Sequence, residues 1–82
     1  MLTLLGKPDC HLCHEMAAVV RRVLGDGALL EEADVRSNPE WDRLYRREIP
    51  VLLWDGREIA RHRTDEAALR ETLAGLGVPI RK

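Results

Sequence analysis

The sequence contains no phenylalanine, and two tryptophans and one tyrosine are its only aromatic residues. It also has no long apolar run, because the apolar start Leu2 to Leu5 is interrupted by Gly6, Lys7 and Pro8. Such a segment is too short for a signal peptide or a membrane span. We therefore expect a cytoplasmic protein that does not bind membranes.

Neither sign of charge dominates the composition. Thirteen Lys and Arg stand against fourteen Asp and Glu, and no run of like charge is longer than Arg46-Arg47. Binding to nucleic acid by charge requires a basic patch or stripe, so we expect no nucleic-acid partner. A chain of 82 residues with 45% apolar side chains fits one small globular domain, residues 1–82, which we expect to be a monomer.

The chain has only two cysteines, Cys10 and Cys13, in the stretch KPDCHLCH. In the cytoplasm a permanent structural disulfide is improbable, and so short a loop restrains the unfolded chain very little. The pair therefore suggests a redox centre, a metal site, a haem anchor, or two buried thiols that act as small apolar side chains.

Apolar periodicity and turn residues predict the element order βαβαββα. A short apolar strand at 2–5 leads to a helix that begins near His11, carries Leu12, Met16, Val20, Val23 and Leu24 on one face, and stops between Gly25 and Gly27. A strand at 28–35 follows, and we place it near a sheet edge because Glu31-Glu32 breaks its alternation.

Three further patterns complete the order. Asn38 and Pro39 are typical of a helix start, and Trp41, Leu44 and Tyr45 would share one face of that helix. Strands at 51–54 and 57–60 flank the hairpin turn Asp55-Gly56, and Thr64 or Asp65 caps a last helix with Leu69, Leu73 and Leu76 on one face. We expect an α/β fold with a four-stranded mixed sheet flanked by helices.

The redox interpretation places Cys10 at the start of the first helix, where unpaired amide hydrogens face its sulfur. Lowering a thiol pKa from about 8.5 to about 6.5 raises the thiolate fraction at pH 7 from roughly 3% to roughly 75%, for about 2.7 kcal/mol. A helix end supplies only about 0.3–1 kcal/mol, up to about 2 when partly buried, so nearby amides, Cys13 and Lys7 must add to it against the opposing Asp9. Cys13, one turn later and more buried, would resolve the mixed disulfide.

The other interpretations have weaker support in the sequence. CHLCH matches the haem-attachment pattern with His14 as axial ligand, but haem attachment normally follows export, and Met16 is too close to reach the opposite iron face. A zinc site would combine Cys10 and Cys13 with His11, His14 or His62, but it lacks the usual second cysteine pair. An iron-sulfur cluster on the same thiols, shared across a dimer with His14 or glutathione, would make the protein a scaffold. Partner binding through an exposed Trp41 or Trp54 competes with core packing of both rings.

The chain resembles the glutaredoxins over residues 2 to 76. The similarity lies in KPDCHLC, in Ile49-Pro50 before a strand, in the Asp55-Gly56 hairpin and in TDEAAL at the last helix. It implies a thioredoxin-like fold in which Cys10 is the nucleophile and Cys13 the resolving thiol.

The resemblance also implies a substrate-binding set. Lys7 corresponds to the lysine that meets a glutathione carboxylate, and Asp65 to the aspartate that receives its amino group. Ile49 offers its backbone to a bound peptide, ahead of a cis Pro50. The chain departs from the family in having CHLC for Cys-Pro-Tyr-Cys, Glu48 for a threonine, and Arg61-His62-Arg63 in the region of paired glycines.

We therefore expect a thiol-disulfide oxidoreductase that acts on protein disulfides or glutathione mixed disulfides. Glutathione or a reductase enzyme would be the electron donor, and no bound cofactor or metal is expected. The alternative is a metal or iron-sulfur scaffold that uses the same cysteines.

Overall fold

The computed structural model describes residues 1–25 and 30–78, and its elements follow the predicted order. They are β1 (Leu2–Gly6), α1 (His11–Leu24), β2 (Leu30–Asp34), the 3₁₀ helix η1 (Val35–Ser37), α2 (Pro39–Tyr45), β3 (Val51–Trp54), β4 (Arg57–Arg61) and α3 (Glu66–Gly75). The sheet order is β2-β1-β3-β4, with β1 parallel to β2 and the other neighbours antiparallel. The predicted mixed four-stranded sheet and the edge position of β2 are both confirmed.

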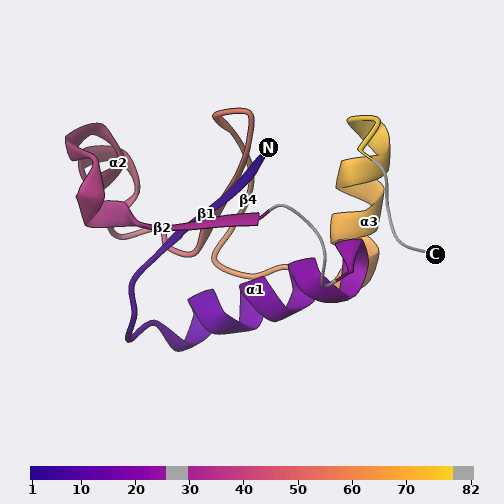
Figure 1. Ribbon diagram of the computed structural model, residues 1–82, viewed down its shortest axis with the longest axis horizontal. Coiled ribbons are helices and arrows are strands. Elements are labelled where there is room, and N and C mark those ends of the chain that lie inside the picture. Colours follow the sequence, from indigo (N-terminus) through magenta and orange to yellow (C-terminus); the bar gives the residue numbers. More distant parts are fainter. Residues whose placement is uncertain (26–29, 79–82) are drawn as a thin grey trace.

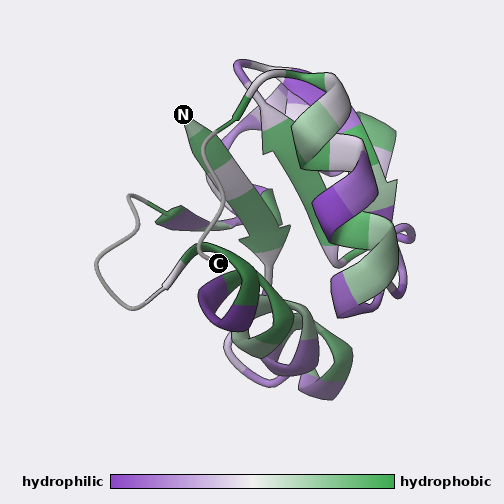
Figure 2. Ribbon diagram, turned by 90° about the vertical axis from the view of Figure 1, so that its right-hand side faces the viewer, coloured by the Kyte–Doolittle hydropathy of each residue, from purple (hydrophilic) through white to green (hydrophobic). Residues whose placement is uncertain are grey.

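Alternation along the two central strands gives the sheet two apolar faces. Leu4 pairs with Leu52, and both belong to the core cluster under α1 and α3. Leu5 pairs with Val51, and both belong to a second cluster next to α2. The helices in Figure 1 therefore flank the sheet on both sides, and Figure 2 shows the apolar colouring of the strands between them.

The second strand is shorter than predicted. Of the predicted range 28–35, residues 28 and 29 lie outside the described chain, as does Gly27 at the predicted helix stop. At the other end, Val35 begins η1, because the Asp34 carboxylate accepts the N–H of Arg36 at 2.8 Å. This bond between side chain and backbone offers an alternative to the sheet ladder and ends the strand.

The α2 helix begins as predicted but buries a narrower face. The Asn38 side chain accepts the N–H of Glu40 at 2.9 Å, as expected of an N-cap. Trp41 and Tyr45 pack against the second core cluster, whereas Leu44, which helical spacing groups with them, is 45% exposed. Leu44 lies about 100° around the helix from Tyr45, beyond the edge that faces the core.

The hairpin and both tryptophans agree with the sequence. Asp55 and Gly56 have φ of 47° and 84°, the left-handed pair that a two-residue hairpin turn of this type requires. Trp54 packs on the first core cluster and Trp41 on the second, which confirms the interpretation that the rings pack in the core. In α3, Leu69 and Leu73 are buried, and Leu76 is the C-cap.

Gly6 is the point at which α1 approaches the sheet most closely. A Cβ atom built on Gly6 would lie 2.8 Å from Sγ and 2.9 Å from Cβ of Cys13. These separations are too short for real carbon contacts, so only glycine lets the first turn of α1 lie against the end of β1. The sequence suggested a loop signal here, but Gly6 is the last residue of the strand.

We expect Gly6→Ala to destabilise the protein, because the added methyl group must displace the Cys13 side chain. Overpacking of this kind costs about 1–3 kcal/mol, which urea denaturation of the oxidised and reduced proteins would measure. Gly75→Ala is the matched control, since nothing lies within 4 Å of its added Cβ. Equal stability of the two variants would contradict the close contact.

Candidate active site

Cys10 is the N-cap residue of α1, as the sequence predicts. Its backbone is extended, with φ of −94° and ψ of 106°, and its Sγ accepts the N–H of Cys13 at 3.1 Å. The first turn contains no acidic residue. The positive end of the helix therefore acts on this sulfur without an opposing carboxylate in that turn.

Cys10 and Cys13 form a disulfide with their Cα atoms 5.2 Å apart. Cys10 is half-buried, whereas Cys13 is only 4% exposed, which confirms its predicted greater burial. The pair thus presents one sulfur toward the surface and keeps the other behind it, against Gly6.

Ile49 and Pro50 lie on the segment that enters β3. Their peptide bond is cis, as the resemblance implies. The Pro50 carbonyl accepts the N–H of His62 at 2.8 Å, which ties the start of β3 to the segment before α3. Within the described residues, the backbone N–H and C=O of Ile49 have no hydrogen-bond partner. These groups are free to pair with an extended substrate chain.

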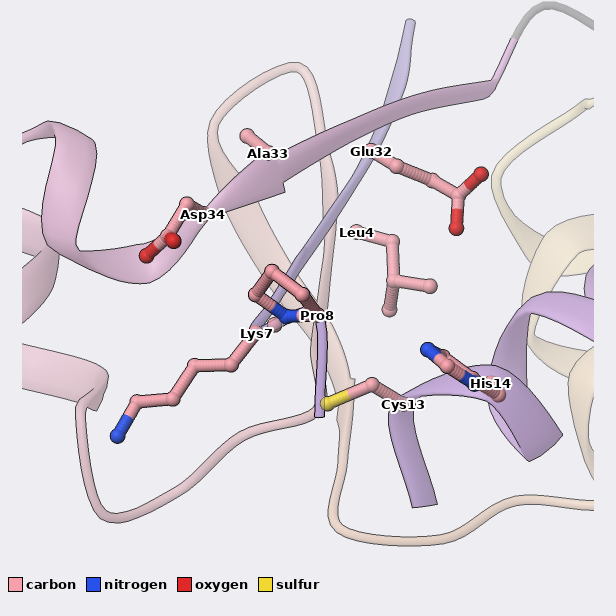
Figure 3. A pocket seen from close by; sticks show the side chains of 9 residues that line it. Leu4, Lys7, Pro8, Cys13, His14, Glu32, Ala33 and Asp34 are labelled. Carbon is pink, nitrogen blue, oxygen red and sulfur yellow. The ribbon is translucent and has the colours of Figure 1, made fainter. Parts of the chain in front are cut away.

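A cavity of about 220 Å³ borders Cys13, and we call it the Cys13 cavity. It lies between the start of α1, the turn after β1, and β2 (Figure 3). Its ionisable lining side chains are Lys7, His14, Glu32 and Asp34. Only Lys7 among these was predicted as a substrate-binding residue. Sequence reasoning missed Asp34, because only the parallel pairing of β2 with β1, in which Asp34 is in register with Gly6, brings it to this cavity.

Both carboxylates of the Cys13 cavity are engaged by arginines. Arg36 hydrogen-bonds the Asp34 side chain and lowers its pKa to about 2, with a smaller contribution from the charge of Lys7. Glu32 accepts a hydrogen bond from Arg21 at 2.8 Å. At neutral pH the carboxylate of Asp34 is therefore fully ionised and a weak proton acceptor.

A second cavity, of about 490 Å³, lies between α1 and the start of α3, and we call it the α3 cavity. Asp65 lines it together with His62 and Arg63, facing Leu12 and Glu15 of α1. The predicted substrate-binding residues are therefore divided. Lys7 lines the Cys13 cavity, Asp65 lines the α3 cavity, and Ile49 and Pro50 line neither.

Asp65, and not Thr64, caps α3. One carboxylate oxygen of Asp65, Oδ1, accepts the N–H of Ala68 at 2.8 Å. The other oxygen has no hydrogen-bond or ion-pair partner in the part of the chain that the structure describes. Asp65 can therefore cap the helix and still offer a carboxylate oxygen to a cationic ligand group.

The cationic segment before α3 is partly neutralised. Arg61 forms ion pairs with Glu58 and Glu48, and its hydrogen bond lowers the pKa of Glu58. His62 Nε2 lies 3.4 Å from a Glu48 oxygen. Arg63 is exposed and has no ion pair among residues 1–25 and 30–78, so it is the cation of this segment that stays open to a ligand.

The described residues also bear on the zinc hypothesis and on membrane spanning. No group of three or more His, Cys, Asp or Glu residues that could hold a metal ion occurs within the described ranges, so the zinc hypothesis lacks a third ligand there. None of the helices in those ranges is long and apolar enough to cross a membrane.

Comparison with known proteins agrees with this geometry. Residues 1–74 match the family described as glutaredoxin-like domain (DUF836). The chain belongs to this family. It is also similar to the X-ray structure of Northeast Structural Genomics target protein XcR50 from X. campestris, with 25% sequence identity and a TM-score of 0.75 over 92% of this chain and 97% of that one. The fold is thioredoxin-like, and a glutaredoxin-like domain with a C-x-x-C disulfide fits a redox role.

For this glutaredoxin-like protein, substitutions at Asp65 separate capping from ligand binding. We expect Asp65→Ala to lower the free energy of unfolding by about 0.5–2 kcal/mol, because the N-cap acceptor is lost. Asp65→Asn is the matched control, since asparagine caps equally well but carries no charge. Urea denaturation that finds both variants equally stable would contradict the capping role.

Proposed function

We propose that the protein is a thiol-disulfide oxidoreductase in which Cys10 attacks and Cys13 resolves. The observation that carries this proposal is the hydrogen bond from the Cys13 N–H to the Cys10 sulfur at the start of α1. It marks the less buried sulfur of the pair as the one that the protein can hold as a thiolate. A purely structural disulfide would have no need of that arrangement.

The proposed reaction has two displacement steps. The Cys10 thiolate attacks one sulfur of a substrate disulfide, and the other substrate sulfur leaves as a thiolate. Cys13 then gives up its proton and attacks Cys10, which releases the second substrate thiol and leaves the Cys10–Cys13 disulfide. The substrate disulfide gains two electrons and the protein dithiol loses them. An external thiol reductant reverses these steps and restores the dithiol.

The contacts at Cys10 can supply the free energy that is needed to lower its thiol pKa. Lowering the pKa of a thiol by about two units requires about 2.7 kcal/mol. A hydrogen bond to a charged group contributes about 1.5–3 kcal/mol, and a helix start adds about 0.3–1 kcal/mol. The Cys13 N–H and the helix together therefore suffice, even with Asp9 next to Cys10.

The polar groups that have no partner at the predicted substrate-binding residues favour a peptide-like substrate that carries both an ammonium group and carboxylates. The free backbone of Ile49 suits an extended chain, the second Asp65 oxygen suits an ammonium group, and Lys7 and Arg63 suit carboxylates. Protein disulfides and glutathione mixed disulfides have this chemistry. We further propose that the protein is a cytoplasmic monomer that receives electrons from glutathione or from a reductase enzyme. It needs no resident cofactor.

Serine variants of the two cysteines test the division of roles. We expect Cys10→Ser to abolish reduction of a glutathione mixed disulfide, because the attacking sulfur is gone. Cys13→Ser should still attack and then accumulate a mixed disulfide that intact mass spectrometry detects. Reduction by Cys10→Ser at the rate of the parent protein would refute the assignment.

The ionisation of Cys10 can be tested separately. The measurement uses the Cys13→Ser variant, in which Cys10 is the single thiol. Alkylation by iodoacetamide as a function of pH should have its midpoint about two units below the value of about 8.5 for free cysteine. The physical reason is the helix-start hydrogen bonding, which favours the charged form. A midpoint equal to that of free cysteine would contradict an activated nucleophile.

A further inference from the structure

The resolving step poses a problem of proton transfer. In the reduced protein Cys13 would carry its proton in a site where it is only 4% exposed, and burial disfavours the charged thiolate. Before Cys13 attacks the mixed disulfide on Cys10, that proton must reach an acceptor. On one side Cys13 is closed by Gly6, but on another it borders the Cys13 cavity.

The Cys13 cavity can hold the water needed for such a transfer. Its volume is about 220 Å³. A single ordered water requires about 10–15 Å³ of this kind of space and a few polar partners. The cavity is lined by four ionisable side chains, so the polar partners are present. A proton can thus leave Cys13 without the thiol itself becoming exposed.

Three of the four ionisable side chains are poor acceptors. Asp34 is held ionised by Arg36, and Glu32 is hydrogen-bonded to Arg21. A lysine ammonium is a donor at neutral pH, and the Lys7 side chain extends away from Cys13 and His14 in Figure 3.

His14 is the remaining lining group, on the same turn of α1 as Cys13. It is exposed, and its imidazole has no hydrogen bond or ion pair with any residue in the described ranges. Imidazole is the side chain that exchanges protons near neutral pH. In Figure 3, Glu32 extends from β2 on the side of the cavity across from His14.

We propose that His14 accepts the proton of Cys13 through water in the Cys13 cavity during the resolving step. The inference rests on the proposed function, since it concerns the second displacement. The Cys13 S–H bond breaks, its proton passes to the His14 imidazole, and the Cys13 sulfur forms a bond with Cys10. The bond between Cys10 and the substrate breaks, the substrate sulfur leaves with the electron pair, and the imidazolium returns its proton to that thiolate or to solvent.

Stopped-flow reaction of the reduced protein with dithiobis(nitrobenzoate) separates the two displacements. Attack by Cys10 releases one coloured thiolate in a first phase, and attack by Cys13 releases another in a second phase. At pH 7 we expect His14→Ala to slow the second phase by about tenfold or more, as loss of a proton acceptor does, and to leave the first phase unchanged. The difference should vanish at alkaline pH, where Cys13 ionises unaided, and free imidazole should restore the rate at pH 7.

The matched control is His11→Ala, on the same helix. The His11 side chain is 90% exposed beside Glu15 and does not line the Cys13 cavity, so its loss should leave the second phase and its imidazole response unchanged. A His14→Ala second phase with the rate and pH profile of the parent would overturn this inference alone. A parent protein with no fast first phase would overturn the proposed function, and the inference with it.

Discussion

The contact between Gly6 and the Cys13 side chain is the constraint on which the rest of the site depends. It lets the first turn of α1 lie directly on the end of β1, with no side chain between helix and sheet. Because Cys13 is fixed there, Cys10 falls at the start of the helix, where Cys13 itself donates a backbone hydrogen bond to its sulfur. The close approach of α1 to Gly6 thus determines both the burial of Cys13 and the environment of the Cys10 sulfur.

The same contact also gives the two sulfurs different surroundings. Cys10 lies at the surface end of the helix, whereas Cys13 lies behind it, next to a cavity whose carboxylates are neutralised by Arg21 and Arg36. On the other side of α1, the α3 cavity carries Asp65 with one unoccupied oxygen. Substrate recognition and proton transfer can therefore be served by separate cavities on either side of one helix.

Local patterns in the sequence predicted those features that depend on neighbours along the chain. Asn38 and Asp65 are N-caps because a side chain reaches amides two or three residues ahead, and Asp55-Gly56 forms its turn from backbone preference alone. The burial of Leu69 followed from helical periodicity, and that of Cys13 from its place one turn after the helix start.

The features that were missed depend on contacts between distant segments. The Gly6 contact requires knowing how closely α1 approaches β1, which no local pattern encodes. From the sequence, His14 was only a possible metal or haem ligand and Glu32 a break in strand alternation, and only the parallel pairing of β1 with β2 brings the two residues to one cavity. The exposure of Leu44 was also missed, because periodicity groups it with Trp41 and Tyr45 but does not reveal how narrow the contact of a seven-residue helix is.

The segment before α3 holds a non-glycine residue in a left-handed conformation. His62 has a φ of 65°, a left-handed conformation that glycine adopts without strain, in the region where glutaredoxins carry paired glycines. Its N–H bonds the Pro50 carbonyl and its ring lies 3.4 Å from Glu48, contacts that offset the unfavourable conformation. Both His62 and Arg63, which has no ion pair among residues 1–25 and 30–78, border the α3 cavity.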